Sequence, residues 1–103
     1  MSPELLQKLE RLQGASIELV PFNVMINHYL LARGGFVALV EKVPKGFGKI
    51  GAPGIMTQKG FACLIWRESE AFFVTKGFDQ QATIEQIEGL RMFSADLHQA
   101  LAD

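Results

Sequence analysis

A glycine-rich segment with two lysines is the part of this sequence whose spacing is closest to a known binding motif. Gly46, Gly48 and Gly51 match G-x-G-x-x-G, but a dinucleotide-binding turn needs a helix to begin there, and a proline and a further glycine follow instead. The remaining functional interpretation is a flap over 45–54 that binds a small anion through its lysines and exposed backbone N–H groups. The alternative is a surface loop whose glycines serve turn geometry. The candidate ligand-binding residues are Lys45, Gly46, Gly48, Lys49 and Gly51.

The single cysteine and the two histidines could form a nucleophile and its base only if they meet in space. Cys63 has bulky apolar neighbours, whereas a nucleophilic cysteine needs a partly exposed, electropositive setting. We therefore expect Cys63 to pack in a core, with His28 as the first candidate base if it does not. His98 lies near the end of a predicted helix, where a cation suits the helix dipole. Two histidines without a carboxylate at ligand spacing predict no metal site.

The acidic pairs and the tryptophan also have structural explanations. Glu85 and Glu88 lie one turn apart near the start of a predicted helix, where negative charge is favourable. Trp66 beside Arg67 could stack on a base, but one aromatic residue in a chain of net charge −1 falls short of a nucleic-acid surface. We predict no catalytic residues, no cofactor and no nucleic-acid partner.

Two apolar runs, 61–66 and 71–74, are separated by only four polar residues and predict a β-hairpin. A two-residue turn between Arg67 and Glu70 sets the register and places these opposite charges across from each other. The predicted pairs are Cys63 with Val74, Leu64 with Phe73, Ile65 with Phe72, and Trp66 with Ala71.

Both faces of this hairpin are apolar. One face carries Phe61, Cys63, Ile65, Phe72 and Val74, and the other carries Ala62, Leu64, Trp66, Ala71 and Phe73. An antiparallel sheet normally shows water one polar face, so each side here must be covered by a helix or by another chain. We predict self-association through an apolar surface that includes one or more of Leu64, Trp66 and Phe73.

Amphipathic helices are predicted near both ends of the sequence. The first covers residues 3–13, with Ser2 as the N-cap and Gly14 as the stop. In the second, Thr83 and Gln86 form a capping box. Its apolar stripe, which we expect to pack on the sheet, consists of Ile84, Ile87, Leu90, Phe93, Leu97 and Leu101.

The region before the hairpin is harder to interpret. Residues 17–20 predict a short strand, and 24–31 fit a helix that ends at Gly34-Gly35. The alternative is a long strand that turns at these glycines into a strand over 36–43. We favour the helix, because the apolar residues cluster at helical spacing. Residues 44–54 predict a loop and 55–57 a short strand.

Charge is distributed unevenly along the chain. Residues 33–67 carry six basic side chains and one acidic one, whereas 68–103 carry seven acidic and two basic ones. These segments can neutralise each other within one fold or between two copies. We expect a solvated surface of mixed charge, since a nearly neutral domain lacks the basic patch of a nucleic-acid binder.

With 103 residues the sequence predicts a single α+β domain, 1–103. We expect a three- to four-stranded, mostly antiparallel sheet flanked by the N-terminal and C-terminal helices. No apolar stretch reaches the roughly 20 residues of a membrane span, and the N-terminal residues lack the apolar core of a secretory signal. We therefore expect no membrane partner and a cytoplasmic location.

The functional prediction is a non-catalytic interaction or binding module that forms a homodimer. It rests on the doubly apolar hairpin and on the absence of a convergent catalytic set. The alternative is a small-ligand or nucleotide-binding protein that uses residues 45–54 as an anion-binding flap. An unknown protein partner, as in a structural subunit of a larger assembly, is indistinguishable from the first prediction by sequence.

Overall fold

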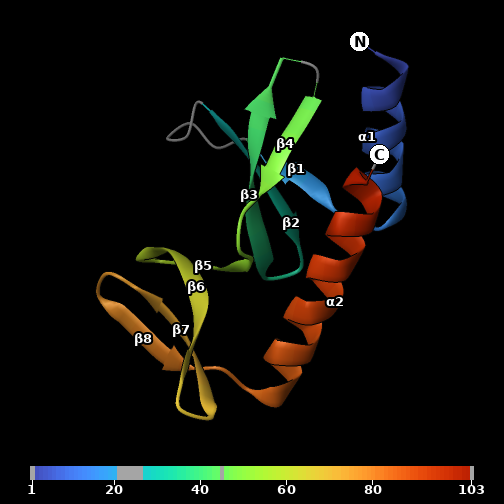
Figure 1. Cartoon of the computed structure of the whole chain (residues 1–103). Coiled ribbons are helices and arrows are strands. Elements are labelled where there is room, and N and C mark those ends of the chain that lie inside the picture. Colours follow the sequence, from blue (N-terminus) through green and yellow to red (C-terminus); the bar gives the residue numbers. More distant parts are fainter. Residues whose placement is uncertain (1, 21–26, 45, 103) are drawn as a thin grey trace.

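The computed structural model describes residues 2–20, 27–44 and 46–102, which form two helices and one curved antiparallel sheet (Figure 1). The elements are α1 (Pro3–Gly14), β1 (Glu18–Val20), β2 (His28–Arg33), β3 (Phe36–Val43), β4 (Gly46–Ile50), β5 (Gly54–Thr57), β6 (Gly60–Arg67), β7 (Glu70–Thr75), β8 (Phe78–Gln81) and α2 (Ile84–Leu101). The α+β class and the antiparallel sheet are confirmed. The predicted three or four strands are too few, because the sheet has eight and curls into a half-barrel.

Strand β3 joins two parts of the sheet. One edge of β3 pairs with β2, and the other edge is shared by β5, which pairs near Phe36, and by β4, which pairs from Val40 onward. Gly54 of β5 is needed at this junction, since a Cβ there would lie 2.0 Å from the backbone oxygen of Ala62. We call β1–β4 the upper sheet and β5–β8 the lower sheet (Figure 1).

Helix α2 lies along both parts of the sheet (Figure 1). Its capping box is present as predicted: the Gln86 N–H donates to Thr83 Oγ1 at 3.1 Å, and the Thr83 N–H donates to Gln86 Oε1 at 2.9 Å. Phe93, fully buried, stacks on Phe36 of β3 with ring centroids 6.4 Å apart. Gly89 leaves room for the same Phe36 ring, which a Cβ would approach to 2.7 Å.

Helix α1 packs against the C-terminal part of α2, beside the upper sheet (Figure 1). Ser2 caps α1 as predicted, with its hydroxyl accepting from the Leu5 N–H at 3.2 Å. The helix extends one residue beyond the predicted 3–13, to Gly14. Helices α1 and α2 and the upper sheet together enclose most of the core. The buried residues in this part of the core are Leu12, Ile17, Leu31, Ala38, Val40, Leu97, Ala100 and Leu101.

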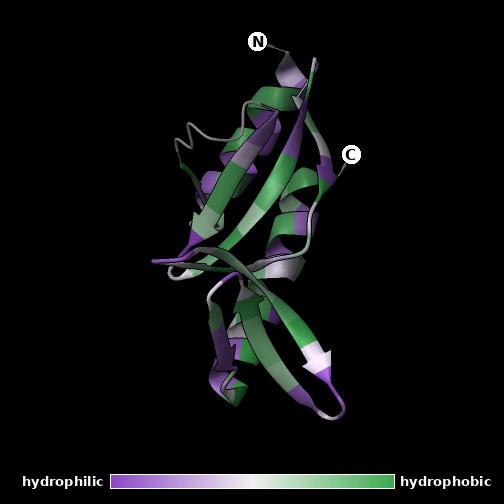
Figure 2. Ribbon diagram, turned by 90° about the vertical axis from the view of Figure 1, so that its left-hand side faces the viewer, coloured by the Kyte–Doolittle hydropathy of each residue, from purple (hydrophilic) through white to green (hydrophobic). Residues whose placement is uncertain are grey.

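The predicted hairpin is confirmed as β6 and β7, in the predicted register from Cys63↔Val74 to Arg67↔Glu70. Figure 2 shows these strands coloured as hydrophobic over most of their length, with hydrophilic residues at the connecting turn. Glu68 in that turn has φ 59°. The short strand predicted at 55–57 is also present, as β5.

Within the described residues, two ion pairs join the basic and acidic segments of the sequence. Arg33 contacts Asp96 of α2 at 2.8 Å. Arg67 of β6 makes two hydrogen bonds to Asp79 of β8, at 2.9 and 3.2 Å. At these two places the opposite charges of the two segments do compensate within one chain.

Three further sequence predictions need correction. Residues 28–33 form β2 and turn through Gly34-Gly35 into β3, so over its described residues the predicted helix is wrong and the strand alternative is confirmed; residues 24–26 of the predicted helix lie outside the described part of the chain. The predicted loop 44–54 contains β4. Ile84, placed in the packed stripe, is 79% exposed.

Across residues 2–20, 27–44 and 46–102, neither helix is long and apolar enough to cross a membrane.

Candidate functional site

The glycine and lysine residues predicted to form an anion-binding flap lie mainly in a strand. Gly46, Gly48 and Lys49 belong to β4, Gly51 follows it, and Lys45 lies outside the described residues. Lys49 and His28 do line one cavity of about 220 Å³, together with Leu39, Glu41 and Gly51. A Cβ on Gly48 would lie 2.7 Å from Glu41 Oε1. The Glu41 carboxylate therefore covers the backbone that an anion would approach, and its charge opposes an anion there.

Cys63 and the histidines do not form a nucleophile and base. Cys63 is half-buried in β6, between Val74 of β7 and Gly54 of β5. Burial raises the pKa of its thiol, which opposes thiolate formation. His98 is exposed on α2, where its Nδ1 lies 2.8 Å from the Ser94 carbonyl oxygen, and His28 is in β2. In the described part of the chain, no group of three or more potential ligands could hold a metal ion.

The three residues predicted for an interface differ in exposure. Phe73 has no exposed surface and lies in the core of its own chain, so it offers a partner nothing. Leu64 is half-buried. Trp66, near the end of β6, is 59% exposed although it shares a face with Phe73. The face of the hairpin that carries these three residues is thus covered at Phe73 and exposed at Trp66.

An open groove of about 670 Å³ lies between this side of the hairpin and α2. Strand β6 lines it with Leu64 and Trp66, Pro53 lines it from the segment before β5, and α2 contributes Ile87, Leu90, Arg91, Ser94 and Ala95. Its size is within the range of about 300 to 1,000 Å³ that is common for ligand sites. Most of the lining is apolar, so the groove is suited to binding an apolar side chain or segment.

The charges near the groove belong to exposed ion pairs. Arg91 contacts Glu88, one turn earlier on α2, at 2.6 Å, and both side chains are more than half exposed. Arg67, next to Trp66, points to the opposite face of the sheet, where it stacks on Phe72 at 4.8 Å. The groove itself therefore presents one cation, Arg91, together with the hydroxyl of Ser94.

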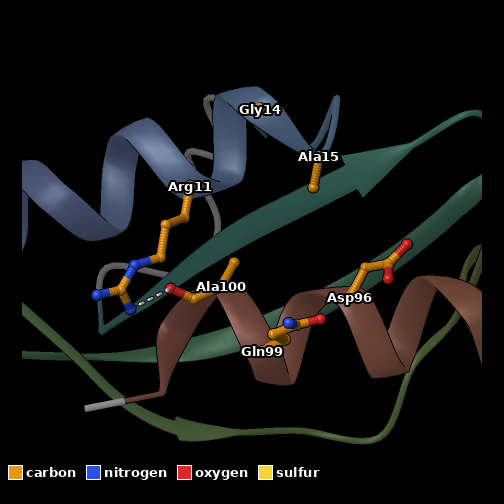
Figure 3. Close-up of a pocket in the computed structure, with 6 residues that line it drawn as sticks. All are labelled: Arg11, Gly14, Ala15, Asp96, Gln99 and Ala100. Carbon is orange, nitrogen blue, oxygen red and sulfur yellow. Dashed lines mark hydrogen bonds between the residues drawn. The ribbon is translucent and has the colours of Figure 1, made fainter.

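A second cavity, of about 300 Å³, lies between α1 and α2 (Figure 3). Its arginine is used structurally: Arg11 donates to the carbonyl oxygens of Ala100 and Ala102, at 3.4 and 2.8 Å. Asp96 accepts from Arg33, which also donates to the Ala15 carbonyl oxygen at 3.1 Å. These groups join the two helices and β2, so the cavity is explained by packing.

Sequence reasoning missed part of the groove. Ile87 and Leu90 were assigned to the packed stripe of α2, while Pro53, Arg91, Ser94 and Ala95 were not singled out. One feature of the sequence could have indicated it. Ser94 and Ala95 are small residues between Phe93 and Leu97, so the helix surface is less filled by side chains at this point. The approach of Pro53 and β6 to this area depends on long-range packing that a sequence pattern does not contain.

Comparison with protein-family models, with curated proteins and with solved structures gives no match.

Proposed function

We propose that this protein is a non-catalytic interaction module that forms a homodimer through the groove between β6 and α2. The observation that carries the proposal is the groove itself, which is lined mostly by apolar residues, among them the exposed Trp66. Exposed apolar surface next to a hollow marks an interaction site more often than isolated apolar residues do.

The energetics favour occupation of the groove by another apolar surface. Complete burial of a large apolar side chain contributes about 1.5 to 3 kcal/mol, and Trp66 retains more than half of its exposure in the single chain. Tryptophan is also among the residue types that contribute most at protein interfaces. Covering Trp66 together with Leu64 would therefore stabilise a complex formed at this groove.

The substitution Trp66→Ala tests the proposal. Light scattering over a range of micromolar concentrations should show a dimer for the unchanged protein. The Trp66→Ala variant should dissociate at roughly 30-fold higher concentration, which corresponds to a loss of about 2 kcal/mol. The matched control is Leu6→Ala, since Leu6 is also exposed and apolar but lies on α1. A monomeric unchanged protein, or equal effects of both substitutions, would contradict the proposal.

Anion binding at residues 45–54 is the second candidate. One observation favours it, namely that Lys49 and His28 line the same cavity, and the Glu41 carboxylate in that cavity counts against it. Titration with inorganic phosphate, compared between the unchanged protein and Lys49→Ala, separates the candidates. Saturable binding that Lys49→Ala abolishes would support the anion site.

The cytoplasmic location and the absence of a nucleic-acid partner remain predictions. The first rests on the N-terminal residues, which lack the apolar core of a secretory signal, and the second on the low net charge of −1. An unknown protein partner in place of a second copy would occupy the same groove and would appear as a monomer in light scattering of the purified chain.

A further inference from the structure

Helix α2 has an exposed face directly beside the groove. Ile84, Glu88, Arg91 and Ala95 are all exposed and follow one another at intervals of four, three and four residues. Side chains at these intervals lie on the same side of a helix. Arg91 and Ala95 also line the groove, so this face, which we call the α2 face, is continuous with it.

The order of residues on the α2 face is self-complementary when the direction of the helix is reversed. Read from either end, it runs apolar, charged, charged, apolar, and the intervals are the same in both directions. A two-fold axis between Glu88 and Arg91 would therefore place Glu88 opposite the partner's Arg91, and Ile84 opposite the partner's Ala95. In a two-fold interface every such contact occurs twice.

We propose that a second copy of this chain docks by its own α2, antiparallel to the first, with the two α2 faces in contact in this register. The proposal deepens the homodimer proposed above and rests on it. The occupant is a second copy, because the charge order of the face complements itself. A parallel arrangement about a two-fold axis would instead bring Glu88 opposite Glu88 and Arg91 opposite Arg91, and like charges in direct opposition are unfavourable.

The charged residues set direction and register more than they add affinity. Glu88 and Arg91 already form an exposed pair within the chain, and an exposed ion pair contributes only about 0 to 1 kcal/mol. In the antiparallel dimer four charges alternate in sign across the axis, so each carboxylate has a guanidinium on its own helix and one on the partner. Complementary charges of this kind select one alignment over its alternatives.

The apolar residues of the face supply the burial. Ile84 is the most exposed of the large apolar side chains in the described residues, and the partner's helix would cover it. Ala95, with Ser94 beside it, is small enough for the helix axes to approach within roughly 8 to 10 Å. Trp66 lies across the groove from Arg91 and Ala95, so a helix on this face would also reduce the exposure of Trp66.

Charge reversal tests the register. Glu88→Arg places an arginine opposite the partner's Arg91 on both sides of the axis. Arg91→Glu places a glutamate opposite the partner's Glu88 on both sides. Each variant alone should dissociate at about tenfold higher concentration than the unchanged protein in analytical ultracentrifugation. Mixed in equal amounts, the two variants should form a heterodimer with restored affinity, because each then meets the opposite charge. The double variant Glu88→Arg/Arg91→Glu should also regain affinity.

The matched control is Glu85→Arg, a charge reversal on the same helix but off the α2 face, which should leave dissociation unchanged. Circular dichroism of every variant verifies the fold, which these exposed positions should not alter. A dimer that responds equally to all three reversals, or variants that do not recover on mixing, would overturn the antiparallel pairing and leave the homodimer in place. A monomeric unchanged protein would overturn both.

Discussion

The two parts of the molecule use the same long helix but cover it to different extents. At the upper sheet, α2 packs against the strands and also against α1, and its residues Leu97, Ala100 and Leu101 are buried. Among the residues that the structure describes, no second helix lies beside α2 at the lower sheet (Figure 1). There Ile84 and Trp66 are mostly exposed, and the groove of about 670 Å³ remains open. Other exposed apolar side chains, none of which lines the groove, are Leu6, Leu19 and Val43 in the upper part, Met56 and Ile65 in the lower sheet, and Met92 on α2.

This difference suggests what the lower part lacks. In the upper part α1 supplies a second layer along α2, fixed by hydrogen bonds from Arg11 to the last turn of that helix. The α2 of a second copy would supply the equivalent layer in the lower part. Dimerisation would then complete, between chains, the packing that α1 provides within one chain.

The largest expected effect is on folding. Phe93 is fully buried where α2 meets the junction of the two sheets, against Phe36 and under Arg33. Phe93→Ala should lower the free energy of unfolding by about 3 to 5 kcal/mol, because the ring leaves a cavity. Its neighbour Met92 is mostly exposed, so Met92→Ala should change stability by less than about 0.5 kcal/mol. Urea denaturation at low protein concentration measures both, and equal effects would show that α2 packs through another face.

A smaller effect is expected on the reactivity of Cys63. This residue lies on the face of the β6–β7 hairpin that points away from the groove, where it is half-buried and burial raises the pKa of its thiol. Because the thiolate is the reactive form, a small maleimide should label the native protein more slowly than the denatured chain at neutral pH. The difference between the native and denatured labelling rates should decrease as the pH rises through the pKa of the folded thiol. Since Cys63 faces away from the groove, the native rate should not depend on protein concentration; rapid labelling at neutral pH, or protection on association, would contradict this.

Short-range sequence patterns correctly predicted the β6–β7 hairpin and the start of α2. The β6–β7 register followed from alternation and the short turn between Arg67 and Glu70, and the start of α2 followed from Thr83 and Gln86. The groove itself was not predicted. Of its lining, Leu64 and Trp66 were named as interface residues, but its second side is formed by residues more than twenty positions later in the chain.

The errors have physical causes as well. In β2, Leu30 and Leu31 are adjacent and both buried, so this strand is buried on both faces and lacks the alternation that marks a strand. Strand β4 contains two glycines, which disfavour strands in isolation. Strand β8, with Asp79, Gln80 and Gln81, has little intrinsic strand preference and forms by pairing with β7.

Hydrogen–deuterium exchange at two protein concentrations tests most directly whether the lower part is the association surface. At high concentration the first three turns of α2, residues 84–95, and the end of β6 around Trp66 should gain protection, because a second copy covers them. Peptides from α1 and β1–β4 should exchange at the same rate at both concentrations. Added protection confined to the upper part, or none anywhere, would contradict the account.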